Sequence, residues 1–374
     1  MKKIYFYTTL TFMTVFLGSC DNKKMSHNYM AFDNIRYATN FPFSFSLNKA
    51  VEIDLEREVD IIGAMHFIIQ DSLLIFSTKD KNGFWSFVSL PDYHFLGKFL
   101  VQGQGPYEFL QSPSTSSKTR FFRENEELFA TIYHRSGKLY KMNVSESLKA
   151  NRLNIAPLNE YLSPGLLDFV FIDCTTFLCR ELNGTETQQI RYILKNNEKI
   201  IPSHIERLNF AKIRENGSFN DFNILAANTK YNTERKLFVE APVFLNYINM
   251  YSINDAFRKT ICIGGKMDNI EEIQDIPFFD RLYTFVGLRL FPEFWGVLHI
   301  NESVKNYQTN KECCPKILLF DWSGNPLAQL ELTNFATSFD IDFVNGYLYT
   351  LELETEAFFK YDIRDILQKL KTKN

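Results

Sequence analysis

Long apolar runs are missing from this sequence after residue 17, so no later segment has the length to cross a bilayer as a helix. An excess of one charge is missing as well. The chain has 41 basic and 44 acidic residues and no basic block, which excludes the usual surface for a phosphate backbone, and we expect no nucleic-acid partner. Proline and glycine are scarce, with 12 and 16 residues, which argues against a low-complexity chain.

Local catalytic motifs are also absent. The sequence has no His-x-x-x-His pair and no Gly-x-Ser-x-Gly turn, and its six histidines are scattered. Five cysteines follow Cys20, an odd number that cannot pair completely within one chain. Cys174 is expected in a turn, where it cannot easily meet Cys179 with bridge geometry, and Cys313 and Cys314 lack nearby metal-binding partners. We interpret these cysteines as free thiols.

The N-terminus has the order of a secretory signal. Two lysines precede a 14-residue apolar run, Ile4 to Leu17, which is too short for a comfortable transmembrane helix. Leu17-Gly18-Ser19-Cys20 follows and resembles the bacterial lipobox, which implies cleavage before Cys20 and a lipid on its sulfur. We predict a signal peptide over 1–19 and a lipidated tether over 20–42. The alternative is a plain signal peptide with an incidental cysteine.

Aromatic-rich strands that end in a polar residue recur along the rest of the chain. Their last residues are Ser89, Asn143, Lys195, Asn254, Asp321 and Asp362, at intervals of 54, 52, 59, 67 and 41 residues. Periods of roughly 40–50 residues made mostly of strands are typical of propeller blades. The aromatic content of 16% suits strand faces that pack blade on blade. The sequence therefore predicts an all-β fold, a six-bladed β-propeller, with an open sandwich of the same strands as the alternative.

The last repeat lacks one strand. It has three clear strands, two of them joined by Asn345-Gly346, a strong hairpin signal, and it ends in a charged tail from Arg364. Residues 43–47 and 51–55 alternate apolar and polar side chains as half-buried strands do. We predict that this N-terminal segment completes the last blade, so that the propeller spans residues 43–374.

A glycine-rich segment follows the first predicted blade. It contains Gly103, Gly105, Pro106, Glu108 and Phe109, in the pattern Gly-x-Gly-Pro-x-Glu-Phe. Glycine permits a sharp backbone path that proline then stiffens, so we predict a structural loop. It is no dinucleotide loop, because a glutamate stands where the third glycine belongs and no helix pattern follows.

This segment, with the lipobox ahead of it and the strands at 347–349 and 360–362, resembles the six-bladed β-propeller lipoproteins common in Bacteroides-type bacteria. These proteins are often called TolB-like or NHL-like propellers. The resemblance covers roughly the whole body of the chain. It is strongest in the Gly-Pro segment and at the C-terminus. It implies a propeller fold and an envelope location, as an outer-membrane lipoprotein on either face, but no settled activity.

Two pairs of residues are candidates for a binding site. Trp322, in a polar turn, and Trp295 are candidates for stacking on a sugar, although an aromatic residue in a β-rich chain is more often core. Asp340 and Asp342 alternate on what is expected to be the innermost strand of the last blade, where their oxygens could hold a calcium ion. Two carboxylates do not specify a metal site, and a solvated strand end explains them as well.

The sequence thus favours a lipid-anchored binding or scaffolding module of the cell envelope over an enzyme, with a glycan or an envelope protein as its partner. One alternative is a propeller lyase or hydrolase that acts on a glycan or lactone-like substrate, because propellers can assemble sites from separate blades. Another is a subunit of an outer-membrane uptake assembly, which predicts a large exposed apolar patch.

Overall fold

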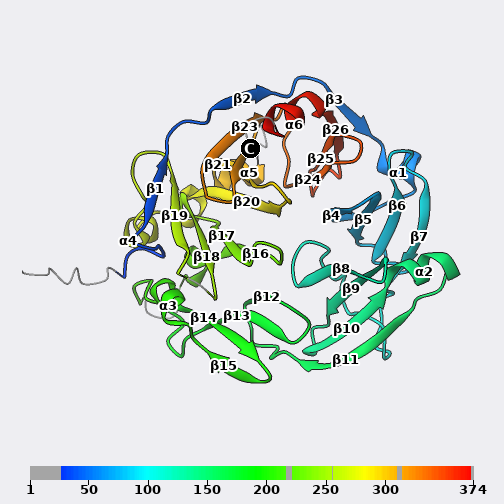
Figure 1. Ribbon diagram of the computed structural model, residues 1–374, viewed down its shortest axis with the longest axis horizontal. Helices are drawn as coiled ribbons and strands as arrows, with labels where there is room; N and C mark the ends of the chain where they lie inside the picture. Colours follow the sequence, from blue (N-terminus) through cyan, green and yellow to red (C-terminus); the bar gives the residue numbers. More distant parts are fainter. Residues whose placement is uncertain (1–26, 216–220, 255, 310–313, 372–374) are drawn as a thin grey trace, which may run out of the picture.

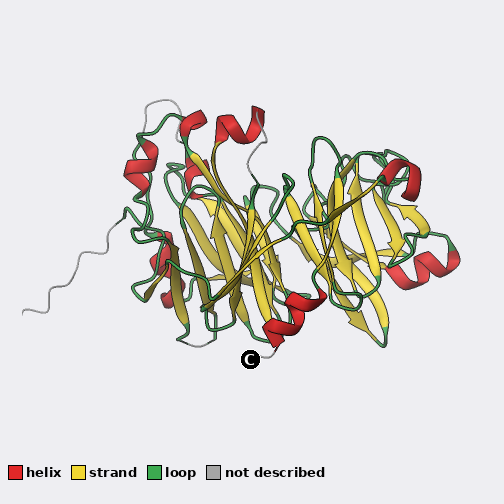
Figure 2. Ribbon diagram, turned by 90° about the horizontal axis from the view of Figure 1, so that it is seen from above, coloured by secondary structure: helices red, strands yellow, loops and turns green. Residues whose placement is uncertain are grey.

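The computed structural model describes residues 27–215, 221–254, 256–309 and 314–371. Six small sheets stand around a central axis in Figure 1, with the first strand of each sheet innermost. In the side view of Figure 2, the strands run between the two faces of the ring and most helices lie at its edges. The predicted six-bladed β-propeller is confirmed.

Each blade is built from four antiparallel strands. Blades one to three contain β4 (Ala64–Gln70), β5 (Leu73–Thr78), β6 (Trp85–Ser89) and β7 (Phe95–Phe99); β8 (Thr119–Glu124), β9 (Glu127–Tyr133), β10 (Lys138–Asn143) and β11 (Ile155–Tyr161); and β12 (Asp168–Phe171), β13 (Thr176–Leu182), β14 (Gln189–Lys195) and β15 (Glu198–Ile200). Blades four to six contain β16 (Ala227–Asn232), β17 (Leu237–Pro242), β18 (Tyr247–Ser252) and β19 (Arg258–Ile263); β20 (Leu282–Leu290), β21 (Phe294–Ser303), β22 (Lys316–Asp321) and β23 (Pro326–Glu331); and β24 (Ser338–Asp342), β25 (Tyr347–Leu351), β26 (Phe358–Asp362) and β3 (Ala50–Ile53). The six repeated strands of the sequence are the third strand of each blade, so the repeat count is confirmed.

The N-terminal segment closes the ring. Strand β3 pairs antiparallel with β26 and is the fourth strand of blade six, as predicted for residues 51–55. Residues 43–47 belong to a different blade. Strand β2 (Phe43–Ser46) pairs parallel with β23 and adds a fifth strand to blade five. Strand β1 (Ile35–Ala38) likewise adds a fifth strand to blade four by pairing with β19. The predicted place of residues 43–47 was therefore wrong by one blade, because alternation identifies a strand and not its partner.

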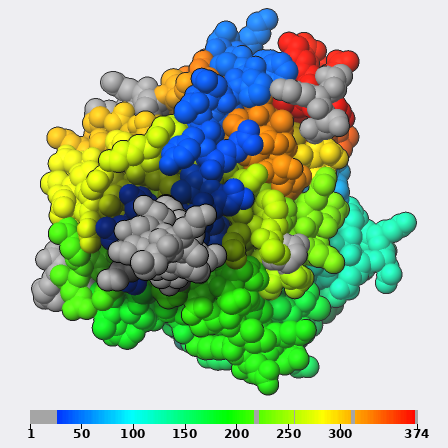
Figure 3. Space-filling view, turned by 60° about the vertical axis from the view of Figure 1, so that its left-hand side comes forward, coloured from blue at the N-terminus to red at the C-terminus, as the bar shows by residue number. Residues whose placement is uncertain are grey.

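The predicted tether over 20–42 needs correction, because its second half belongs to the body. Met30, Ala31 and Phe32 are buried. The amide of Met30 donates to the Tyr247 hydroxyl at 3.0 Å, and the amide of Phe32 donates to the Thr260 hydroxyl at 2.8 Å. Figure 3 shows this blue segment lying across the surface of blades four and five. The predicted signal peptide and Cys20 lie outside the described residues.

Each hydrophobic cluster fills the space between two neighbouring blades. Between blades six and one, the rings of Phe67, Phe76 and Phe358 meet with centroids 5.2–6.0 Å apart. The other five clusters join the remaining neighbours in the same way. Each buried aromatic side chain contributes about 1.5–3 kcal/mol, which explains why the sequence is so rich in phenylalanine.

Short helices cap the blades and their connections. They are α1 (Leu55–Val59), α2 (Val144–Ala150), α3 (Ser203–Asn209), α4 (Ile270–Gln274), α5 (Val304–Thr309) and α6 (Arg364–Lys371), with 3₁₀ turns η1 (Phe222–Leu225) and η2 (Phe278–Asp280). Helix α6 corrects the predicted charged tail. Its Ile366, Leu367 and Leu370 share one face and are buried in the cluster between blades five and six, as helical spacing allows.

One ion pair is completely enclosed between blades three and four. The guanidinium of Arg191 on β14 binds the carboxylate of Glu240 on β17 at 2.6 Å, and neither side chain is exposed. The Tyr251 hydroxyl donates to the same carboxylate at 3.2 Å. Burial alone would raise the pKa of Glu240, but the charge and hydrogen bonds of Arg191 outweigh burial and lower that pKa.

Candidate functional site

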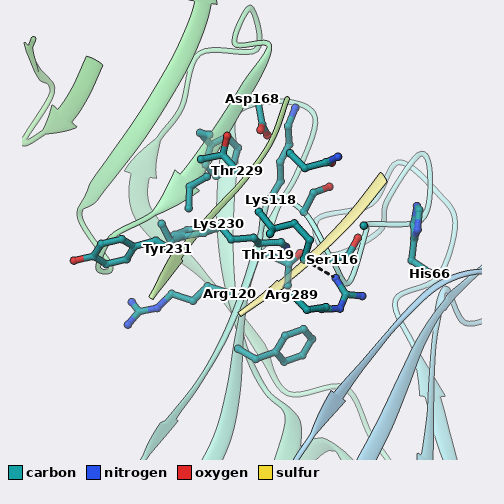
Figure 4. Close-up of a pocket in the computed structure, with 18 of the residues that line it drawn as sticks. His66, Ser116, Lys118, Thr119, Arg120, Asp168, Thr229, Lys230, Tyr231 and Arg289 are labelled. Carbon is teal, nitrogen blue, oxygen red and sulfur yellow. Dashed lines mark hydrogen bonds between the residues drawn. The ribbon is translucent and has the colours of Figure 1, made fainter. Parts of the chain in front are cut away.

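The candidate site is the central channel of the ring. The innermost strands of blades three, four, five, six and one contact one another in that order. The innermost strands of blades one to five, with the segment before β8, line a cavity of about 320 Å³. Figure 4 shows that the side chains around this space come from different blades. The polar residues that line it are His66, Ser116, Ser117, Lys118, Thr119, Arg120, Asp168, Asn228, Thr229, Lys230, Thr233 and Arg289.

Lysine 230, on β16, has the most unusual environment in this channel. Its ammonium has no hydrogen-bond or ion-pair partner among the described residues, although the side chain is half-buried. Burial first, and the charge of Arg289 second, lower the pKa of Lys230 from 10.5 to about 7. The carboxylates of Asp168 and Asp340 act in the opposite direction and are too weak to restore the pKa.

Arginine 289, on β20, is buried and holds three blades together. Its Nη2 donates to the backbone oxygen of Phe67 on β4 at 2.7 Å. Its Nε lies 3.4 Å from Oδ2 of Asp340 on β24, but it makes no hydrogen bond within the described part of the chain. Such a buried donor usually serves a water molecule or a ligand.

The carboxylates near the channel are already engaged. Asp340 is almost fully buried, and its Oδ2 accepts from the amide of Ile69 at 3.0 Å while facing Arg289. Burial raises the pKa of Asp340 despite these partners. Asp168 binds Arg180 at 2.7 Å, and the same guanidinium also donates to the backbone oxygen of Ala227.

The charge balance of the channel is therefore positive. Four cations line the cavity, whereas Asp168 is the one carboxylate among the described residues that line it; the cations are Lys118, Arg120, Lys230 and Arg289. Histidine 66 is neutral at pH 7, because burial, then Arg289 and then Lys230 lower its pKa to about 4. A low-dielectric channel lined by more cations than carboxylates attracts a negatively charged ligand.

A hydroxyl-rich segment, residues 112–119, forms part of the channel wall, and we call it the serine loop. It is held rigidly from both sides. The indole Nε1 of Trp85 donates to the backbone oxygen of Pro113 at 2.7 Å, and the Thr119 hydroxyl donates to the backbone oxygen of Ser114 at 2.7 Å. The serine loop belongs to the connection between β7 and β8, which is long and has no helix, as functional loops often are.

The serine loop also borders a second cavity of about 500 Å³, which we call the outer hollow. Its lining residues are Phe109, Leu110, Gln111, Ser112, Pro113, Ser114, Ser117, Lys118, Thr119, Tyr133, His134, Arg135 and Pro164. Ser117, Lys118 and Thr119 line both cavities. The side chain of Lys118 leans over the Tyr133 ring, with Nζ 5.7 Å from its centroid.

The predicted structural loop at Gly103, Gly105 and Pro106 precedes the serine loop. A Cβ at position 103 would lie 1.8 Å from Oε2 of Glu108, and the amide of Gly105 donates to that same oxygen at 2.8 Å. The Tyr140 hydroxyl donates to the backbone oxygen of Pro106 at 2.9 Å. The glycines thus make room for the glutamate that closes the loop, and these contacts hold the start of the connection in place.

The two tryptophans proposed to stack on a sugar lie away from the channel, between blades four and five. Trp295 is fully buried and stacks on Phe320 with centroids 4.4 Å apart. Trp322 is 8% exposed, and its Nε1 donates to the backbone oxygen of Pro292 at 3.0 Å. Because both indoles are buried, neither presents an open face on which a sugar could stack. Their burial argues against the predicted stacking role.

The predicted calcium ligands do not form a cation site. Asp340 does lie on the innermost strand of blade six, but it faces Arg289, whose charge opposes a metal ion. Asp342 instead closes the turn after β24 by accepting from the amides of Val344 and Asn345 at 2.9 and 3.0 Å. Within the described residues, no three His, Cys, Asp or Glu side chains are grouped so as to hold a metal.

Sequence reasoning missed the four cations of the channel. Lys230 lies within the mostly polar strand β16, Arg289 is the next-to-last residue of the mostly apolar strand β20, and Lys118 and Arg120 flank the start of β8. The available signal was positional, because a charged residue within the first strand of a blade faces the axis. It could not be used without the strand boundaries of each blade.

The fold and the channel together define a class: the protein is a six-bladed β-propeller with a basic, hydroxyl-lined central channel. The sequence matches no family model, and comparison with curated proteins finds no match. Among solved structures, a member of the duf4221 family from Bacteroides vulgatus is similar, with 8% identity and a TM-score of 0.53 over 84% of this chain and 96% of that chain. At this identity, the likeness shows the fold alone.

A protein from Bacteroides fragilis described as exported also aligns with 87% of this chain and 98% of its own, at 10% identity and a TM-score of 0.49. No helix in the described part of the chain is long and apolar enough to span a membrane.

Proposed function

We propose that this protein is a lipid-anchored binding module of the cell envelope that takes a small anionic ligand in its central channel. The lipid anchor and the envelope location rest on the signal peptide and the lipobox-like segment that ends at Cys20. One protein of similar fold is described as exported, which agrees with this location; the proposal does not rest on that description.

The observation that carries the proposal is the unpartnered ammonium of Lys230 beside the buried guanidinium of Arg289. Placing a cation in a half-buried site costs free energy unless a partner offsets it. A ligand carboxylate or phosphate between these two side chains would supply that partner, and the hydroxyls of Thr119 and Thr229 lie around the same space. The Thr229 hydroxyl is itself buried and has no hydrogen-bond partner among the residues that the structure describes.

Binding is proposed in preference to catalysis. A catalytic channel needs a base or a nucleophile that is matched to neutral pH, together with a second group that orients it or exchanges its proton. Lys230 has a pKa of about 7 and meets the first requirement, but the described lining residues place no free acid or base beside it. His66 has a pKa near 4 and is a weak base there. The carboxyl groups of Asp168 and Asp340 are occupied by arginines.

Isothermal titration calorimetry tests the proposal on the chain from residue 21, which retains every described contact. The ligands are phosphate, acetate and galacturonic acid, with glucose as the neutral comparison. We expect an anion to bind, and Lys230→Met to weaken it about tenfold or more, since a hydrogen bond to a charged group contributes about 1.5–3 kcal/mol.

The matched control is Lys149→Met, which removes an equally sized but exposed lysine of α2. It should leave binding unchanged. The proposal fails if none of the anions binds, or if Lys149→Met and Lys230→Met weaken binding equally.

A further inference from the structure

The channel and the outer hollow adjoin one another, because the same short piece of chain lines both. Ser117, Lys118 and Thr119 line each of them. Lys118 takes a left-handed backbone conformation with φ of 55°, and its ammonium leans over Tyr133, which lines the outer hollow. A positive charge therefore stands where the two cavities meet.

The two cavities also have the same chemistry. The channel offers Lys230 and Arg289, and the outer hollow offers Arg135, an exposed residue. Hydroxyl and amide side chains fill the intervals between these cations in both cavities: Gln111, Ser112, Ser114, Ser116, Ser117, Thr119, Asn228, Thr229 and Thr233.

We propose that the channel and the outer hollow bind one extended ligand, an acidic oligosaccharide. One of its acidic groups lies between Lys230 and Arg289, and the next lies near Lys118 and Arg135. This inference rests on the proposed anion site and adds the class and the length of the ligand.

The lining favours an acidic sugar chain over other polyanions. Sugar hydroxyls exchange hydrogen bonds with Ser, Thr, Asn and Gln side chains, each of which can donate and accept. A polyphosphate carries its charges close together and would be matched by clustered arginine forks. In this site the cations form two groups, Lys230 with Arg289 and Lys118 with Arg135, and hydroxyl side chains line both cavities around them, which fits charges that are separated by neutral, hydroxylated units.

The fixed shape of the serine loop supports the same ligand class. Its position is set by Trp85 and by the Thr119–Ser114 hydrogen bond, and the Ser112 hydroxyl lies 2.9 Å from that of Ser77. A loop that is already ordered loses little entropy when a ligand binds, so weak hydroxyl contacts can contribute to affinity.

Calorimetry on the chain from residue 21 tests this inference with four probes: galacturonic acid, trigalacturonic acid, maltotriose and tripolyphosphate. We expect the acidic trimer to bind about tenfold or more tightly than the monomer, and maltotriose to bind too weakly to measure. The variant Arg135→Met changes a residue that lines the outer hollow and not the channel, and it should reduce trimer affinity towards that of the monomer. It should leave monomer affinity unchanged, whereas Lys230→Met should weaken both ligands.

The outcomes separate this inference from the proposed function. If the monomer binds through Lys230 but the trimer gains nothing, the channel remains an anion site and the extended ligand is refuted. Tighter binding of tripolyphosphate than of the acidic trimer would also refute the sugar class. If no probe binds, both proposals fall. Circular dichroism and the melting temperature of each variant show whether a loss of binding comes from unfolding.

Discussion

Two groups of buried charge in this protein follow opposite rules. Between blades three and four, Arg191 and Glu240 enclose one another completely, and Tyr251 completes the set. In the channel, Lys230 has no partner among the described residues, and Arg289 leaves its Nε without a hydrogen bond. The first group is a finished structural contact, whereas the second keeps unsatisfied charge at a cost in stability. Such local costs are expected at functional sites, and this contrast is the reason that we propose the channel as the binding site.

The largest effect on stability is expected from breaking the buried ion pair between Arg191 and Glu240. Glu240→Gln keeps the shape of the side chain but leaves Arg191 buried without a counter-charge, which should lower the free energy of unfolding by about 3–5 kcal/mol. Urea denaturation measures it. Glu331→Gln is the control, because its pair with Lys316 is at the surface and should contribute at most about 1 kcal/mol. Equal effects of the two changes would remove the basis of the comparison.

Arginine 289 should behave as an intermediate case. Arg289→Met removes a donor from the backbone oxygen of Phe67 and the counter-charge of Asp340, so we expect a loss of about 1–3 kcal/mol in urea denaturation. It should also weaken anion binding in calorimetry. If stability falls and binding does not change, Arg289 is a structural clamp and has no part in the site.

Removing the charge of Lys230 should change the free energy of unfolding in the opposite direction. Lys230→Met removes a half-buried charge that has no partner, so it should raise the free energy of unfolding by about 1 kcal/mol while anion binding is lost. Urea denaturation and calorimetry on the same samples measure the two effects. A destabilised Lys230→Met protein would mean that the ammonium has a structural partner, which contradicts the comparison.

The pH dependence gives the most specific test. The pKa of Lys230 is lowered to about 7 in the folded state, so between about pH 7 and 10.5 the unfolded state binds more protons and stability rises with pH. Lys230→Met should flatten this rise. Anion affinity should fall as the pH rises through about 7, because Lys230 loses its positive charge. The other titratable or charged groups that face it are Arg289, His66, Asp168 and Asp340. Affinity that is constant from pH 6 to 9 would contradict this assignment.

Periodicity made the fold predictable, but it did not determine the order of strands at the edge of the ring. The six third strands were visible because each carries aromatic residues and a polar end, which is a local property. The strand at Val51 was placed correctly, and the strand at Phe43 was assigned to the wrong blade. Parallel addition to an outer edge leaves no local signature in sequence. Helix α6 was missed because three apolar residues among charged ones are a weak helical pattern.

The candidate site was hardly predictable at all. The tryptophans and aspartates drew attention as residue types with known binding roles, yet Trp295 is core and Asp342 closes a turn. Lys230 and Arg289 are separated by 59 positions, and nothing in either stretch of sequence indicates that they share a channel.

The sequence by itself determined what depends on neighbours along the chain: the strands and their repeat, the signal-like N-terminus and the glycines that accommodate Glu108. Only the tertiary structure decided which buried charges have a counter-charge and which of them lack one among the described residues. Ring closure brings six first strands to one axis and removes that axis from bulk water, so the same lysine that would be an ordinary surface cation elsewhere becomes a desolvated one. The pKa of Lys230 and its role follow from that arrangement, which no local segment contains.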